Sequence, residues 1–197
     1  YIRNNPPFKK LKKILEIRLE ELIRGCCKNK KSAQSKVYQL YADKLFGICL
    51  KYSRNSPDAE DILQDSFLII FNKINQFKHK GSFEGWLKRI VINTAITKYR
   101  ESKHLYFNEE ILLNEPSSEN LTIETSEIGL DFLLSSIQKL PNRYRLIFNL
   151  YVLDNYSHKD IAKMLNISEG TSKSNLSRAR KILKKQIENY SKPIENK

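Results

Sequence analysis

Aromatic and basic side chains are interleaved between residues 76 and 101, a combination that suits binding to unpaired nucleic-acid bases. Aromatic rings stack on such bases, while cations hold the phosphate backbone. The interleaved residues are Phe77, Phe83, Trp86, Tyr99, Lys78, Lys80, Lys88, Arg89, Lys98 and Arg100. Asn93 adds an amide that could hydrogen-bond to a base edge. The alternative is that Trp86 is a core residue and the lysines form a solvated face.

Near the C-terminus, a short helix, a turn and a basic helix are predicted to follow one another. Ser157 and Asp160 have the spacing of a capping box, the turn falls at Asn166, and Ser168 caps the second helix. The predicted inner face of that helix is Ser172, Leu176, Ala179, Leu183 and Ile187. Residues 171–185 contain six cations and no acid, a crowding that DNA phosphates would relieve. We therefore predict a helix-turn-helix whose second helix enters the major groove.

The outer face of the second helix is predicted to contact the DNA. Lys173 and Arg178 could pair with guanine, and Asn175 with adenine. The full predicted set is Thr171, Lys173, Ser174, Asn175, Arg178 and Lys181. Lys184 and Lys185 lie farther along and would touch phosphates. The alternative is a basic helical hairpin without a DNA partner.

A third candidate surface lies on a helix predicted over residues 58–74. Ser56, Pro57 and Asp58 supply an N-cap, a proline at the first position and an early acid. Its apolar stripe is Ala59, Ile62, Leu63, Phe67, Ile70, Phe71 and Ile74. Its opposite face is Asp61, Gln64, Asp65, Leu68 and Asn72. Two acids on one face of such a basic chain suggest a protein partner, and the alternative is ordinary solvated surface.

Catalytic and metal-binding motifs are not evident in the sequence. It has no GxxxxGK[ST], no HExxH and no Cys/His cluster at zinc spacing. His79, His104 and His158 are far apart in the sequence. Of the four acids at positions 58, 60, 61 and 65, only Asp61 and Asp65 share a helix face, which is too few carboxylates for a two-metal site. We expect a protein that is not an enzyme and that uses no metal or cofactor.

Composition favours a basic, all-α protein that meets a polyanion. The 197 residues carry a net charge of +13, with a pI near 9.6, and include only six glycines and six prolines. Three cysteines, an odd number with no CxxC pair, are expected to be free thiols in a reducing cytoplasm. No apolar run approaches the roughly 20 residues that span a bilayer, so membrane insertion is not expected.

Charge divides the chain into three parts. Between Leu105 and Asp131 there are seven acids and no Lys or Arg, while the flanking parts are basic. We predict two small helical domains, residues 14–104 and 129–190, joined by a flexible acidic linker over residues 105–128. A short acidic helix packed on a neighbour is the alternative for the linker.

Two blocks of the sequence resemble the extracytoplasmic-function (ECF) sigma factors of bacterial RNA polymerase. The first includes LEELIRGC, VYQLYADKLF, DAEDILQDSFLIIFNKI and GSFEGWLKRIVINTA, between Leu19 and Arg100. The second is LPNRYRLIFNLYVLDNYSHKDIAKMLNISEGTSKSNLSRARKILKK, ending at Lys185. The two blocks occur in the family's order, with the acidic segment between them. The resemblance implies a protein that directs promoter-specific transcription initiation.

The resemblance also implies a role for each surface. The Asp61 face would bind the clamp of core RNA polymerase, the helix-turn-helix would read an upstream promoter element, and the flap would be a further polymerase contact. The melted promoter element would be held by Phe77, Lys78, His79, Lys80, Ser82, Trp86, Arg89, Asn93 and Arg100. An anti-sigma factor is a further partner that the family allows. The alternative function is a helix-turn-helix regulator that acts without polymerase.

The sequence departs from the family pattern at a few positions. Residues 28–31 contain no acid where the family usually has one, and Thr97 stands where Asp is frequent. Ser172 and Asn175 replace a common Val and a frequent Arg, which puts the upstream sequence preference in question.

Overall fold

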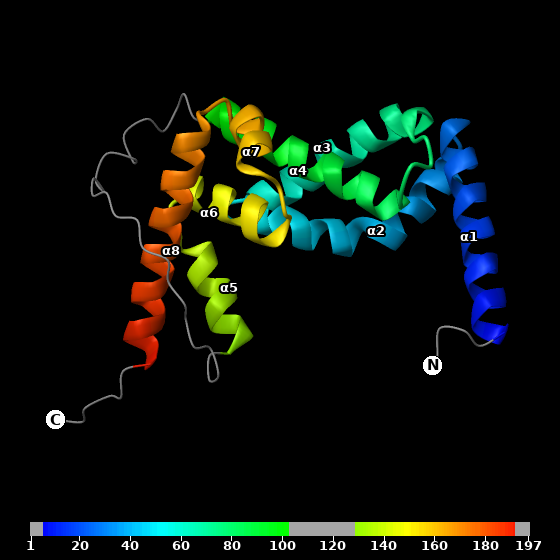
Figure 1. Ribbon diagram of the computed structural model, residues 1–197. Helices are drawn as coiled ribbons and strands as arrows, with labels where there is room; N and C mark the ends of the chain where they lie inside the picture. The colour runs from blue at the N-terminus through cyan, green and yellow to red at the C-terminus, as the bar shows by residue number, and fades with distance from the viewer. Residues whose placement is uncertain (1–5, 103–128, 192–197) are drawn as a thin grey trace. The chain divides into compact units, whose positions relative to one another are not determined.

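The chain folds into helices alone over the residues that the structure describes. The computed structural model describes residues 6–102 and 129–191, and no strand occurs in those ranges (Figure 1). Packing divides the chain into two compact units, Tyr1–Ala95 and Ile96–Lys197, with the division inside one helix. The prediction of an all-α protein with two small helical domains is confirmed. The predicted linker, residues 105–128, lies outside the described residues.

The first unit contains three helices, one short helical turn and the greater part of a fourth helix, whose last residues are assigned to the second unit. These elements are α1 (Pro6–Cys27), α2 (Lys31–Tyr52), α3 (Ser56–Lys73), the 3₁₀ turn η2 (Ile74–Gln76) and α4 (Phe83–Ser102). α2 packs against both α1 and α3, and η2 packs against α1. Val37, Leu45, Ile70 and Leu87 are among the side chains that this packing removes from water. Burial of such apolar surface is the main stabilising contribution.

The turn between α1 and α2 is tight because Gly25, in the last turn of α1, lies against Ala33 of α2. A Cβ placed on Gly25 would lie 2.7 Å from the Cβ of Ala33, so no larger residue fits without a shift. Asn29 takes the left-handed conformation, with φ 54°. The Lys30 N–H donates to the Gly25 carbonyl at 3.0 Å. The backbone path between the two helices is therefore well determined.

α3 begins as expected except for its cap. The Asn55 side chain accepts from the Asp58 N–H at 2.8 Å, while Ser56 is already the first helical residue. The expectation that Ser56 caps the helix is wrong, because Asn55 is the cap and its side chain already accepts the hydrogen bond from the Asp58 N–H. The predicted apolar stripe is buried except for the half-buried Phe71.

The second unit is built around the C-terminal helix. It contains α5 (Leu130–Gln138), α6 (Asn142–Phe148), the π-helical segment η3 (Asn149–Leu153), α7 (His158–Leu165) and α8 (Glu169–Ser191). α8 packs against α5, α6 and α7. Leu140, Tyr144, Ala179 and Leu183 form one buried cluster. The two helices of the predicted helix-turn-helix, α7 and α8, thus pack on the elements that precede them, as a helix-turn-helix requires.

The three cysteines are free thiols, as expected. Cys26 and Cys49 are fully buried, and burial raises the pKa of Cys49 to about 12. Such thiols are poor nucleophiles at neutral pH. None of the helices in the described part of the chain is long and apolar enough to span a membrane.

Arg145 is a buried cation that joins α6 to the end of α5. It is 4% exposed, donates from Nη1 to the Gln138 carbonyl at 2.9 Å, and donates from Nη2 to Asn142 Oδ1 at 3.0 Å. Hydrogen bonds from a charged group contribute about 1.5–3 kcal/mol. We expect Arg145→Ala to lower the free energy of unfolding by about that amount, seen as a lower urea midpoint of the helical signal. The exposed Arg180→Ala should leave the midpoint unchanged, and equal midpoints for both variants would contradict the assignment.

Candidate nucleic-acid interfaces

The aromatic residues before and at the start of α4 form one cluster. The Phe77 ring centroid lies 5.2 Å from that of Phe83 and 5.6 Å from that of Trp86, and Phe83 and Trp86 stack at 5.8 Å. Tyr41 of α2 contacts Phe83 at 5.7 Å. Phe83 is buried, whereas Phe77 and Trp86 are half-buried. Trp86 is therefore partly a core residue, through its contacts with Phe77 and Phe83, and partly accessible to solvent.

The loop that leads to this cluster presents its cations outward. Lys78, His79 and Lys80 are exposed, and the His79 ring lies 4.6 Å from the Phe77 ring. His79 and Gly81 have positive φ values of 54° and 134°. The loop between η2 and α4 therefore turns through two residues with positive φ, and Lys78 and Lys80 are the immediate chain neighbours of the His79 that contacts Phe77.

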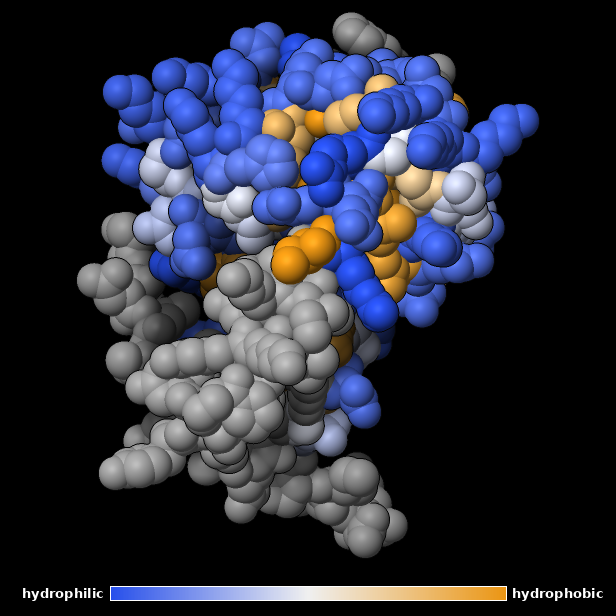
Figure 2. Space-filling model, turned by 90° about the vertical axis from the view of Figure 1, so that its right-hand side faces the viewer, coloured by the Kyte–Doolittle hydropathy of each residue, from blue (hydrophilic) through white to orange (hydrophobic). Residues whose placement is uncertain are grey.

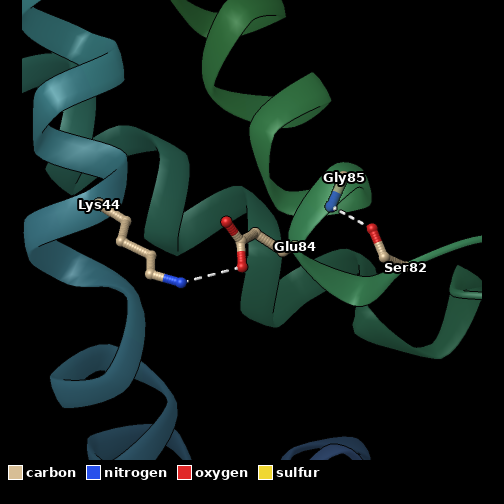
Figure 3. Close-up of polar contacts among 4 residues, drawn as sticks. All are labelled: Lys44, Ser82, Glu84 and Gly85. Atoms are coloured by element: carbon tan, nitrogen blue, oxygen red, sulfur yellow. Dashed lines mark hydrogen bonds and ion pairs between the residues drawn. The ribbon is translucent and has the colours of Figure 1, made fainter. Parts of the chain in front are cut away.

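The first turn of α4 is held by two polar contacts (Figure 3). Ser82 Oγ accepts from the Gly85 N–H at 3.0 Å and so caps the helix, although its side chain was predicted to touch DNA. Lys44 Nζ of α2 donates to Glu84 Oε2 at 3.1 Å. Both partners of this ion pair are more than half exposed, so its contribution to stability is small. The ion pair links the first turn of α4 to α2 and so helps to position α4.

One face of α4 is exposed along its length. Arg89, Asn93, Thr97 and Arg100 are exposed and recur at the helical spacing that begins at Trp86. Leu87 and Val91 lie on the opposite, buried face. The predicted residues of this helix therefore share one surface with the aromatic cluster.

The predicted polymerase-binding residues of α3 also share one face. Asp61, Gln64 and Asn72 are exposed and Asp65 is half-buried. Leu68, between them, is 65% exposed. Sequence reasoning missed Tyr38 of α2, which is 45% exposed and whose ring lies 4.6 Å from that of Phe67. The face is thus an apolar centre with acidic and amide neighbours.

The helix-turn-helix is formed by α7 and α8 as predicted. Ser157 Oγ accepts from the Asp160 N–H at 3.1 Å and its hydroxyl contacts Asp160 Oδ2 at 2.6 Å. Asn166 ends α7 in the left-handed conformation, with φ 53°. Ser168 Oγ accepts from the Thr171 N–H at 2.9 Å and so caps α8. Both predicted caps are present.

The outer face of α8 contains all but one of the predicted DNA-binding residues. Lys173, Ser174 and Lys181 are exposed, and Thr171 and Arg178 are half-buried. Asn175 is only 3% exposed, and its Nδ2 has no hydrogen-bond partner. Its position explains the burial, because it lies three residues after Ser172 and four before Ala179, on the inner face. The structure therefore does not present Asn175 on the exposed face, as its predicted pairing with a base would require.

His158 is a contact between α7 and α8 that the sequence did not indicate. Its Nδ1 lies 2.9 Å from Ser172 Oγ, and its ring stacks on Tyr151 with centroids 4.3 Å apart. Burial, followed by the nearby cations Lys173 and Arg180, lowers the pKa of His158. The folded unit therefore favours the neutral form of the His158 imidazole.

This lowered pKa predicts a pH dependence of stability. The unfolded chain takes up a proton on His158 near pH 6.5, whereas the folded chain takes it up only at lower pH. Stability should be full above about pH 6.5 and decrease as the pH falls from there toward the folded pKa. We expect His158→Gln to show a smaller decrease over that window in urea titrations at several pH values. Parallel curves for the variant and the wild type would contradict the role of His158.

No group of three or more His, Cys, Asp or Glu side chains in the described ranges is placed to hold a metal ion. What the surfaces offer is stacking, hydrogen bonding and charge.

Comparison with known proteins identifies the class. Region 2 of the sigma-70 family matches residues 37–104, and region 4 of the same family matches residues 133–183. The first match contains α3, the loop and α4, and the second contains the helix-turn-helix. The chain is thus a sigma factor of the sigma-70 type.

Similar proteins narrow the class further. The ECF RNA polymerase sigma factor SigW of Bacillus subtilis is 28% identical over 88% of this chain and 98% of its own length. The ECF RNA polymerase sigma-E factor of Haemophilus influenzae is 29% identical over 80% of this chain and 89% of its own. The sigma factor RpoE of Bartonella quintana, solved in complex with the anti-sigma factor NepR, aligns with a TM-score of 0.48 and 20% identity over 82% of this chain and 98% of its own. On the two family matches and the two sequence relatives, this chain belongs to the ECF sigma factors.

Proposed function

We propose that this chain binds core RNA polymerase through α3 and directs it to promoters that α8 and α4 recognise. The observation that carries the proposal is that one chain of this family presents three exposed surfaces of different chemistry. They are the Leu68 face of α3, the aromatic and basic surface around Trp86, and the basic face of α8. A regulator that acts without polymerase would have no use for the first two.

The melted strand is held at the Trp86 surface. Unpaired bases stack on the accessible parts of Phe77 and Trp86, and Lys78, Lys80 and Arg89 neutralise phosphates. Such stacking requires the duplex to be open, because paired bases are already stacked on one another. This surface therefore acts after the duplex has opened.

The upstream duplex is read by the first turns of α8. Lys173 and Arg178 are placed to reach guanine O6 and N7, while Thr171, Ser174 and Lys181 contact the backbone. Arg178 is half-buried. An arginine can bury its alkyl part while its guanidinium group stays at the surface, where it could reach the DNA.

The polymerase is bound by the Leu68 face. An exposed leucine contributes buried apolar area at the interface, and Asp61 and Asp65 attract a basic partner surface. The flap of the polymerase and an anti-sigma factor are further partners in this proposal. The chain performs no catalysis of its own and works in the cytoplasm.

Transcription in vitro tests the function directly. Core RNA polymerase is incubated with genomic fragments, with and without the purified chain. We expect specific transcripts only in the presence of the chain. Binding of the same fragments without any affinity for core polymerase would favour the regulator instead.

Asn93 on the exposed face of α4 gives a test of the melted-strand site. We expect Asn93→Ala to reduce open-complex formation by about two- to tenfold, the equivalent of one hydrogen bond. Binding to the upstream duplex should not change. Permanganate footprinting measures the melted bases, and normal melting on several promoters would contradict the assignment.

A further inference from the structure

Two segments of the first unit carry many cations and no acid. Residues 22–42 contain no Asp or Glu, and neither do residues 66–83. Together they carry eight cations: Arg24, Lys28, Lys30, Lys31, Lys36, Lys73, Lys78 and Lys80. The second segment leads into the aromatic cluster and is part of the proposed melted-strand site. The first has no role in that site so far.

The two segments lie beside each other in the fold. η2, which lies between Lys73 and the loop, packs against α1 as well as α3. Figure 1 shows the C-terminal end of α1 next to the loop that joins α3 to α4. Figure 2, which faces that side of the molecule, shows hydrophilic side chains over most of its upper part. The turn between α1 and α2 therefore extends the basic surface of the loop.

The cations of the turn lie on a backbone whose path is restricted by local contacts. Arg24, Lys28, Lys30 and Lys31, which we call the basic turn, are all exposed and make up four of eight consecutive residues. No ion pair among the described residues involves them. The close approach of Gly25 to Ala33 and the left-handed Asn29 set the path of the chain between them. Like charges this close repel one another, and an anionic partner would remove that cost.

We propose that the basic turn binds phosphates of the DNA strand that continues from the Trp86 surface. A strand whose bases stack on Phe77 and Trp86 has its backbone at the cations of the loop, and the adjacent basic turn offers it the next cations. Phosphate contacts of this kind add affinity without reading sequence. The family match to region 2 begins at residue 37 and does not include this turn. The inference rests on the proposed function of the Trp86 surface.

The test uses holoenzyme assembled from core polymerase and the full chain. The probes are labelled fork-junction fragments of a promoter found by the transcription assay. In one probe the single strand covers the melted element alone, and in two others it is extended by thymidines at either end. We expect the wild type to gain affinity from one extension. The variant Lys28→Ser/Lys30→Ser/Lys31→Ser should lose that gain, about tenfold or more near 0.1 M salt, and its salt slope should fall by about two units.

A matched variant controls for net charge. Lys139→Ser/Lys159→Ser/Lys163→Ser removes three exposed cations of the second unit and should keep the gain. Serine at position 30 is a favoured residue before a helix, so the test variant should fold, and circular dichroism checks this. If it does not fold, glutamine replaces serine at the same three positions.

The other outcomes separate the two proposals. If the wild type gains nothing from either extension, or the test variant keeps the gain, the inference about the basic turn is overturned. It is also overturned if the test variant loses affinity for core polymerase in the absence of DNA, since the turn would then bind protein. If Asn93→Ala leaves binding of the shortest probe unchanged, the proposed function of the Trp86 surface fails instead.

Discussion

Charge reversal on α3, by Asp61→Lys together with Asp65→Lys, should abolish the binding of core RNA polymerase. The two carboxylates lie on the same face as the exposed Leu68, where the proposed partner surface would come into contact. Two lysines would set like charges against a basic partner, at a cost of several kcal/mol. A loss of that size lowers affinity by more than a hundredfold, as each 1.4 kcal/mol is a factor of about ten.

A titration of labelled core polymerase with each variant measures this effect. Asp65 is half-buried, so the single variant Asp61→Lys is included, and thermal unfolding checks both. The matched control is Glu20→Lys/Glu21→Lys, which reverses two exposed acids of α1 and makes the same change in net charge. Unchanged affinity in the α3 variant, or an equal loss in the control, would remove the assignment of this face.

The second large effect is expected on α8, where the loss of a base contact and the loss of a phosphate contact should change DNA binding in different ways. Lys173→Ala or Arg178→Ala should each cost about 1–3 kcal/mol on the cognate upstream element and relax the preference at one base pair. Lys185→Ala should weaken all sequences alike and lower the salt slope by about one unit. Lys184 is a poorer choice for this test because its Nζ lies 3.7 Å from Glu188 Oε1.

Asn175→Ala is an internal comparison for this series. Because Asn175 is buried, the substitution should leave the order of preference among DNA variants unchanged. Competition on single-base variants of the upstream element, repeated at several salt concentrations, compares all four variants. If Arg178→Ala weakens every sequence equally, Arg178 holds the backbone and does not read a base.

Much of the fold was predictable because its signals are local. Capping residues and helical periodicity lie within a few positions of one another, so the Ser157 and Ser168 caps and the inner face of α8 were predicted correctly. The same periodicity puts Asn175 near the inner face, three residues after Ser172, but the prediction that it contacts DNA gave its amide more weight than its position. Asn55 was missed as a cap because Ser56 beside it is an equally suitable residue type.

The parts that sequence reasoning missed are contacts between distant segments. Lys44 and Glu84 are 40 residues apart, and nothing in either helix's own pattern pairs them. His158 and Ser172 meet only because the turn after α7 brings α8 back across it. The basic turn was noted only as a departure from a family pattern. Its closeness to the loop of the Trp86 surface follows from the packing of α1 on η2.

The position of Trp86 has an optical consequence. It is the single tryptophan of the chain, and its half-buried ring lies against Phe77 and Phe83. Indole emission depends on the polarity around the ring and is quenched when a nucleobase stacks on it. Excitation of this one side chain in the purified chain would therefore report the arrival of an unpaired strand without any added dye. Stopped-flow fluorescence with single-stranded oligonucleotides would then give the rate at which that strand enters and leaves.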